Sequence, residues 1–82
     1  MKVRIYVMPR KEVLDPQGKA IMSSLSTLGF SNLQEVRQGK LLELTLAEQN
    51  TDKIADIVHE MCKKLLVNEI IEDYNFEIVQ NT

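Results

Sequence analysis

The single histidine and single cysteine of this chain, His59 and Cys62, stand three positions apart in a sequence of 82 residues. A His-x-x-Cys pair on one helix could give a transition metal two ligands, but the sequence offers no third ligand nearby. Cys62 also falls on the apolar stripe of its predicted helix, and cysteine is among the residue types most often buried. We therefore predict no metal site and assign Cys62 to the core.

Hydroxyl nucleophiles cluster in the first predicted helix: Ser23, Ser24, Ser26 and Thr27. A hydrolase or transferase needs a nucleophile beside a base, or paired carboxylates in a cleft. The only histidine, His59, lies far away in the sequence. Arg10 and Lys11 precede the first helix and could attract an anion to its N-terminus. Asp15 occupies the N-cap there and repels anions, so we predict no catalytic and no cofactor-binding residues in this chain.

The first half of the chain begins with apolar and polar residues that alternate over 2–8, which predicts a half-buried strand ended by Pro9. Asp15 and Pro16 then predict a helix, as N-cap and first helical residue, and Gly29 marks its end.

The middle of the chain reads as two strands, 33–37 and 40–46, on either side of Gln38 and Gly39. The two intervening residues are a candidate turn or bulge. The segments could therefore form a tight hairpin, or one long strand bent at Gly39.

The second helix is predicted to be capped by Asn50 or Thr51 and to end near Asn68. Its residues at helical spacing form one broad apolar stripe: Ile54, Ile57, Val58, Met61, Cys62, Leu65 and Leu66. A last strand follows, in which Tyr74, Phe76 and Ile78 alternate with other residues. Residues 80–82 are expected to fray.

The predicted order is β-α-β-β-α-β, an α+β fold with two helices packed on one face of an antiparallel sheet. Residues 1–82 are expected to form a single domain. A core this small is marginal, and a four-stranded sheet has two open edges. We therefore expect an oligomer that assembles through sheet edges or faces.

The composition narrows the classes of partner. Ten basic and twelve acidic residues give a net charge of -2, which favours neither nucleic acid nor an anionic membrane. No apolar run approaches the roughly 20 residues of a membrane span, and the N-terminus lacks a signal-peptide pattern. We expect a cytoplasmic protein.

Other functions that occur on this architecture require residues of different kinds. A metallochaperone would carry Cys-x-x-Cys in the first loop, but residues 9–14 contain no cysteine. An RNA-recognition module needs aromatic residues on its central strands, and 40–46 has none. A small-molecule-sensing regulatory domain of similar fold stays open as the alternative.

Several short motifs occur in a fixed order along the chain: Val13-Leu14-Asp15-Pro16-Gln17-Gly18, Leu28-Gly29, Val36-Arg37-x-Gly39-Lys40, Cys62-x-x-Leu65-Leu66 and Ile71-Glu72-Asp73-Tyr74. In this order, in so short a chain, they resemble the PurS family, the small subunit of phosphoribosylformylglycinamidine synthase. The resemblance runs from the first strand to Tyr74. One departure is Glu69, where the family usually has a proline that would pre-set the turn.

The resemblance implies a non-catalytic assembly subunit of de novo purine biosynthesis. Such a subunit bridges a glutaminase subunit and an ATP-dependent synthetase subunit, so that ammonia from glutamine reaches formylglycinamide ribonucleotide. ATP and Mg would be used by the synthetase partner, and this chain would form a homodimer or homotetramer. The residues expected at partner interfaces are Asp15, Pro16, Gln17, Gly18, Arg37, Gly39, Lys40, Glu72, Asp73 and Tyr74. Helix initiation is the competing explanation for Asp15, Pro16 and Gly18.

Overall fold

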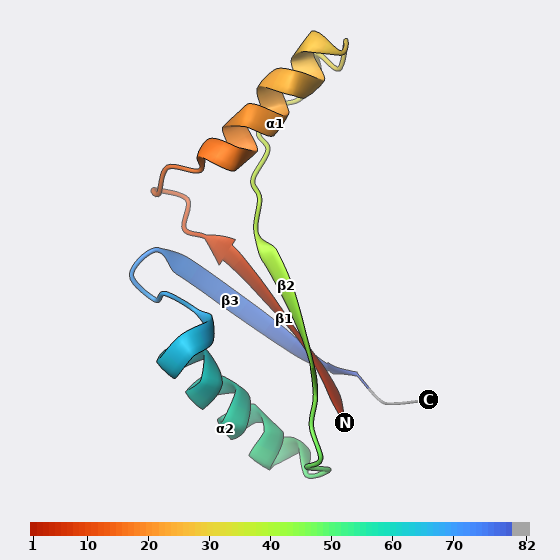
Figure 1. The fold of residues 1–82 in the computed structure, drawn as a ribbon, viewed down its shortest axis with the longest axis vertical. Helices are drawn as coiled ribbons and strands as arrows, with labels where there is room; N and C mark the ends of the chain where they lie inside the picture. Colours follow the sequence, from red (N-terminus) through yellow and green to blue (C-terminus); the bar gives the residue numbers. More distant parts are fainter. Residues whose placement is uncertain (80–82) are drawn as a thin grey trace.

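The computed structural model describes residues 1–79 of the chain (Figure 1). Its elements, in order, are β1 (Lys2–Pro9), α1 (Pro16–Thr27), β2 (Lys40–Thr45), α2 (Thr51–Met61), the π-helical turn η1 (Cys62–Leu66) and β3 (Glu72–Val79). The strands form one antiparallel sheet in the order β2-β1-β3. The α+β class is therefore confirmed. The expected fraying of residues 80–82 lies outside the described residues.

The core lies between the central strand and α2. Alternation along β1 turns Val3, Ile5 and Val7 to one face of the sheet, where all three are buried. They pack with Ile54, Val58 and Cys62 from the apolar stripe of α2 and η1. Cys62 is fully buried, as predicted, and burial raises the pKa of its thiol.

The helix boundaries follow the predicted capping residues. Asp15 caps α1, and Asn50 caps α2 by accepting hydrogen bonds from two backbone amides through its Oδ1 atom. Gly29 takes φ 103°, a left-handed conformation that glycine adopts without strain. The backbone amide of Phe30 donates to the Leu25 carbonyl at 3.0 Å, which closes the last turn of α1.

The predicted strand 33–37 is wrong as an element of this chain's own sheet. The residues from 31 to 39 form no strand, and pairing begins only at Lys40, opposite Val7. The reason is geometric. The central strand ends at Pro9, so the chain before Lys40 extends past the sheet and has no strand of this chain beside it.

The predicted packing of two helices on one face is also wrong within this chain. Figure 1 shows α2 lying across the sheet and α1 projecting away from it, with the returning segment alongside α1. We call α1 and this return, residues 16–37, the arm. Because the arm extends away from the sheet, the radius of gyration of the Cα atoms is 16.1 Å. A compact chain of this length would have about 12 Å.

Neither helix in the described part of the chain has both the length and the apolar character needed to cross a bilayer.

Candidate functional site

The antiparallel register brings the predicted interface segments to one end of the sheet. Val7 pairs with Lys40 and Pro9 pairs with Glu72, so β1 ends where β2 and β3 begin. The loop that leads to α1 also leaves from this end, with Asp15 at its far side. Segments far apart in sequence therefore meet at one place, which we call the junction.

The junction is a surface depression of about 260 Å³. Its lining residues are Pro9, Leu14, Asp15, Gln17, Gln38, Gly39, Lys40 and Glu72. Most of these were predicted at partner interfaces. The lining mixes a carboxylate, an ammonium group and amides with apolar side chains, which suits recognition of a polar loop.

Asp15 connects the start of α1 with the segment that returns to β2, because its carboxylate accepts hydrogen bonds from both. Its Oδ1 accepts from the Gly18 amide at 3.0 Å, which caps α1, and its Oδ2 accepts from the Gln38 amide at 2.9 Å. The Gln38 side chain also donates to Gln17 Oε1 at 2.8 Å. The Gln38 amide, and then the Gly18 amide, hold the pKa of Asp15 below its usual value. Helix initiation therefore explains only half of the contacts of Asp15.

The two glycines of the motifs allow close backbone approach at the junction. A Cβ on Gly18 would lie 2.5 Å from Asp15 Oδ2 and closer still to the Val36 carbonyl oxygen. A Cβ on Gly39 would overlap the Val7 carbonyl oxygen and the Met8 sulfur. A side chain at Gly18 would therefore push α1 from the returning segment, and a side chain at Gly39 would push the returning segment from β1.

Two arginines, Arg37 and Arg10, donate side-chain hydrogen bonds to main-chain carbonyls near the junction. The Arg37 guanidinium donates to the Pro9 carbonyl, and its Nε lies 3.7 Å from Glu35. Arg37, predicted at an interface between subunits, thus bonds within its own chain.

Arg10 holds the loop before β3. Its amide donates to the Ile71 carbonyl at 2.8 Å, and its guanidinium donates to the Glu69 carbonyl at 2.5 Å. Arg10 Nε also lies 3.5 Å from Asp73. Sequence reasoning did not assign Arg10 this role, because its partners lie at the other end of the chain. These contacts fix the loop where the family's usual proline is absent.

Five of the ten predicted interface residues do not line the junction: Pro16, Gly18, Arg37, Asp73 and Tyr74. Among these, Tyr74 contacts helix α2 instead. Its hydroxyl lies 2.6 Å from Nδ1 of His59 on α2, and burial raises its pKa. The His59 ring also contacts Phe76 edge-on, with a 5.3 Å centroid separation. This cluster packs α2 against the edge strand β3.

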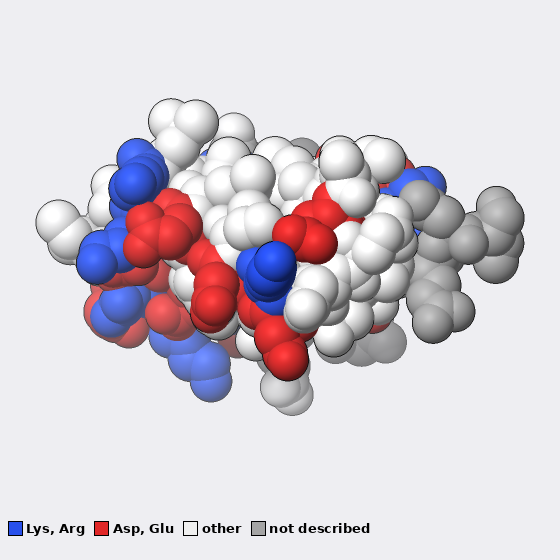
Figure 2. Space-filling model, turned by 90° about the horizontal axis from the view of Figure 1, so that it is seen from below, with Lys and Arg blue, Asp and Glu red and all other residues white. Residues whose placement is uncertain are grey.

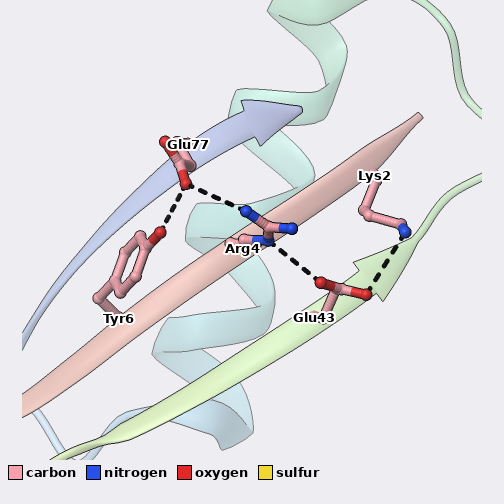
Figure 3. Close-up of polar contacts among 5 residues, drawn as sticks. All are labelled: Lys2, Arg4, Tyr6, Glu43 and Glu77. Carbon is pink, nitrogen blue, oxygen red and sulfur yellow. Dashed lines mark hydrogen bonds and ion pairs between the residues drawn. The ribbon is translucent and has the colours of Figure 1, made fainter. Parts of the chain in front are cut away.

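The sheet face opposite α2 carries a ladder of charges that neutralise one another (Figure 3). Arg4 lies 3.1 Å from Glu43 and 4.0 Å from Glu77, while Lys2 lies 3.5 Å from Glu43. The Tyr6 hydroxyl donates to Glu77 at 2.5 Å. Figure 2, a view from another side, likewise shows acidic and basic side chains interspersed. Figure 2 shows no broad field of one sign on the face that it presents.

Residues 1–79 bring no three histidine, cysteine or carboxylate side chains together as metal ligands. The junction lining contains no histidine, serine, threonine or cysteine, and its charged residues are Asp15, Lys40 and Glu72.

Comparisons with known proteins give one consistent family. The family model described as PurS, phosphoribosylformylglycinamidine (FGAM) synthase, matches residues 2–80. The chain is 44% identical over 77 residues to the phosphoribosylformylglycinamidine synthase subunit PurS of Bacillus subtilis, covering 94% of this chain and 90% of that one. It is 38% identical to the corresponding Methanocaldococcus jannaschii subunit, over 94% of this chain and 93% of the relative.

Solved structures agree with the sequence relatives. The crystal structure of M. jannaschii PurS superposes with a TM-score of 0.87 at 37% identity, covering 99% of this chain and 98% of that one. A chain in the structure of PurLQS from Thermotoga maritima gives a TM-score of 0.85 at 33% identity, with 93% of each chain covered.

Proposed function

This chain belongs to the PurS family of phosphoribosylformylglycinamidine synthase subunits, and we propose that it serves this synthase as an assembly subunit without an active site of its own. In this role it bridges the glutaminase subunit and the ATP-dependent synthetase subunit. Ammonia released from glutamine then reaches formylglycinamide ribonucleotide in de novo purine biosynthesis. ATP and Mg act on the synthetase partner.

The convergence of the motifs at the junction is the observation that carries this proposal. Asp15 and Gly39 flank the arm and Gln17 lies in its first turn, while Lys40 and Glu72 begin two strands. The junction therefore reads as a docking surface whose shape is fixed by internal hydrogen bonds. A preorganised surface loses less conformational entropy when a partner binds. The similarity to a chain of the T. maritima PurLQS structure points the same way.

The chain is proposed to act as a homodimer or homotetramer. Its core is small, and both outer strands of the sheet, β2 and β3, present an open edge. The family match favours this role over the small-molecule-sensing alternative, for which the described residues offer no distinguishing feature.

Reconstitution tests the proposal. Purified synthetase and glutaminase subunits from the same organism are assayed for glutamine-dependent and ammonia-dependent synthesis, with and without this chain. Glutamine-dependent synthesis should require the chain, while ammonia-dependent synthesis should not. Equal glutamine-dependent rates in both mixtures would reject the bridging role.

A charge reversal at the junction sharpens the test. Lys40→Glu changes an exposed lining residue of the junction, whereas the control Lys53→Glu makes the same change on the exposed side of α2. We expect Lys40→Glu to raise the concentration of this chain needed for half-maximal glutamine-dependent activity, and Lys53→Glu to leave it unchanged. Equal behaviour of the two variants would remove the junction from the interface.

A further inference from the structure

The turn that leads into β3 carries an isoleucine that is almost entirely exposed to solvent. Residues 67–71 connect η1 to β3, and Ile70 in this turn is 84% exposed. Turns are usually built from glycine, proline, asparagine, aspartate and serine, which suit their backbone conformations. A side chain so exposed buries little apolar area within the chain, so Ile70 contributes little to folding.

Hydrogen bonds within the turn hold its backbone in one conformation. The Asn68 carbonyl accepts from the amides of Ile71 at 3.0 Å and Glu72 at 2.8 Å. Asn68 Oδ1 accepts from the Ile70 amide at 3.2 Å. The Glu72 carboxylate accepts from the Asn68 amide at 2.8 Å. The three backbone amides of 70–72 therefore all find an acceptor inside the turn.

Arg10 holds the same turn from the first loop. Its guanidinium donates to the Glu69 carbonyl and its amide donates to the Ile71 carbonyl, so the residues on both sides of Ile70 are fixed. A turn that is closed on itself and held at two carbonyls has little backbone freedom to lose when a partner binds. Ile70 is therefore a preorganised apolar projection.

The projection lies at the junction end of the sheet. Glu72 lines the junction and pairs with Pro9, so Ile70 is two residues from the lining (Figure 1). Two more apolar side chains are exposed at this end: Ile71 at 41%, and Leu14 of the junction lining at 67%. Single exposed apolar residues are ordinary on a protein surface. Several of them beside one polar depression indicate an interaction site.

Acidic residues flank Ile70 in the sequence. Glu69, Glu72 and Asp73 are the carboxylates, and the cation that meets them is Arg10, whose Nε lies 3.5 Å from Asp73. Three carboxylates against one guanidinium leave a net charge of -2 around an apolar centre. The surface complementary to this turn is an apolar pocket with a basic rim. A two-fold contact between copies through this turn would instead bring like charges together.

We propose that Ile70 is the anchor by which this chain docks onto a catalytic subunit of the synthase, in an apolar pocket with a basic rim on that subunit. The inference rests on the proposed function and deepens it, because it names the side chain that enters the partner. Anchors of this kind are surrounded by weaker contacts that exclude water. The charged groups of the junction, Asp15, Lys40 and Glu72, are available for those contacts.

Two substitutions at one position test the anchor. Ile70→Ser removes the apolar side chain, whereas Ile70→Val shortens it by one methylene. Leu65→Ser, at a position of η1 that is 83% exposed, is the control matched in chemistry and exposure. Circular dichroism and Tm should be unchanged in all three variants, because exposed substitutions have little effect on stability. Light scattering reports whether a variant alters self-association.

The measurement is the affinity of each variant for the catalytic subunits. Fluorescently labelled chain is titrated with the purified synthetase subunit, with the purified glutaminase subunit and with both together, and binding is followed by anisotropy. Burial of an isoleucine raises affinity about 10- to 100-fold, so Ile70→Ser should bind at least about 10-fold more weakly. Ile70→Val should stay within about 4-fold of wild type, and Leu65→Ser should bind as wild type does.

A charge reversal tests the basic rim. Glu69→Lys should weaken binding, and the difference from wild type should shrink as salt is added, because exposed charges are screened. Tighter binding of Glu69→Lys would overturn the basic rim.

The outcomes that would overturn the anchor are separable from failure of the proposed function. Wild-type affinity in Ile70→Ser would overturn it, as would an equal loss of affinity in Leu65→Ser. Weaker binding of Ile70→Ser that accompanies altered self-association would also overturn it, because the residue would then serve a contact between copies. A wild-type chain that binds neither catalytic subunit, alone or together, would reject the proposed function and the anchor with it.

Discussion

Replacing Gly18 by alanine should have two opposing effects on the free energy of unfolding. Alanine favours a helix over glycine by about 1 kcal/mol, so a freely exposed position would gain stability. At Gly18 the new Cβ would lie 2.5 Å from Asp15 Oδ2 and would overlap the Val36 carbonyl oxygen, which belongs to backbone. Overpacking of this kind costs about 1–3 kcal/mol. Because the carbonyl cannot rotate away as a side chain could, we expect a cost in the upper part of this range, about 2–3 kcal/mol, and therefore a net loss of about 1–2 kcal/mol.

The assay is thermal unfolding followed by circular dichroism at fixed protein concentration, since an oligomer's Tm depends on concentration. A loss of 1 kcal/mol lowers Tm by about 4–8 °C in a domain of this size. Ala20→Gly, at an exposed position of α1, calibrates the helix effect and should cost about 1 kcal/mol. A Gly18→Ala variant that is more stable than wild type would refute the close approach of α1 and the returning chain.

The remaining predictions concern the junction, the core and the edge cluster. The lowered pKa of Asp15 implies stabilisation that is present above the unfolded pKa of about 3.9 and lost as pH falls through the folded value, so Asp15→Asn should flatten that part of the acid dependence of Tm. Ile54→Ala should cost about 2–5 kcal/mol in urea unfolding, because Ile54 is fully buried; a loss below 1 kcal/mol would contradict the assigned core. Tyr74→Phe should cost about 1 kcal/mol and shift the NMR signals of His59, whereas unchanged His59 signals would argue against their 2.6 Å contact.

Local patterns predicted most of the secondary structure. The β1 alternation, the caps Asp15 and Asn50, and the apolar stripe that includes Cys62 all depend on residues near one another in sequence, and the structure confirms them. Asp15 was assigned to helix initiation, yet it also binds the Gln38 amide. That second bond depends on where the chain returns, which no local pattern encodes.

The errors share one physical origin. Residues 33–37 have a strand-like sequence, but a strand needs a neighbour, and β1 ends before it can provide one. The docking of α1 on the sheet was likewise inferred from the apolar stripe alone. An apolar stripe indicates that a helix surface is to be buried, but it does not indicate which other surface buries it. The direction of the chain before β2 is set at Gln38 and Gly39, where the sequence is compatible with a tight turn and with an extended backbone.

The pairing of the first strand with the last has a consequence for folding during synthesis. Lys2 pairs with Val79, so the central strand cannot gain its full β3 partner until the chain up to residue 79 has left the ribosome. The helices and the pairing of β1 with β2 depend on residues that are synthesised earlier and can form first, so the edge of β1 that receives β3 stays open longest. Closing so long a loop slows folding, and the open edge of the central strand invites aggregation. This chain should therefore depend most on chaperones in the interval before β3 emerges.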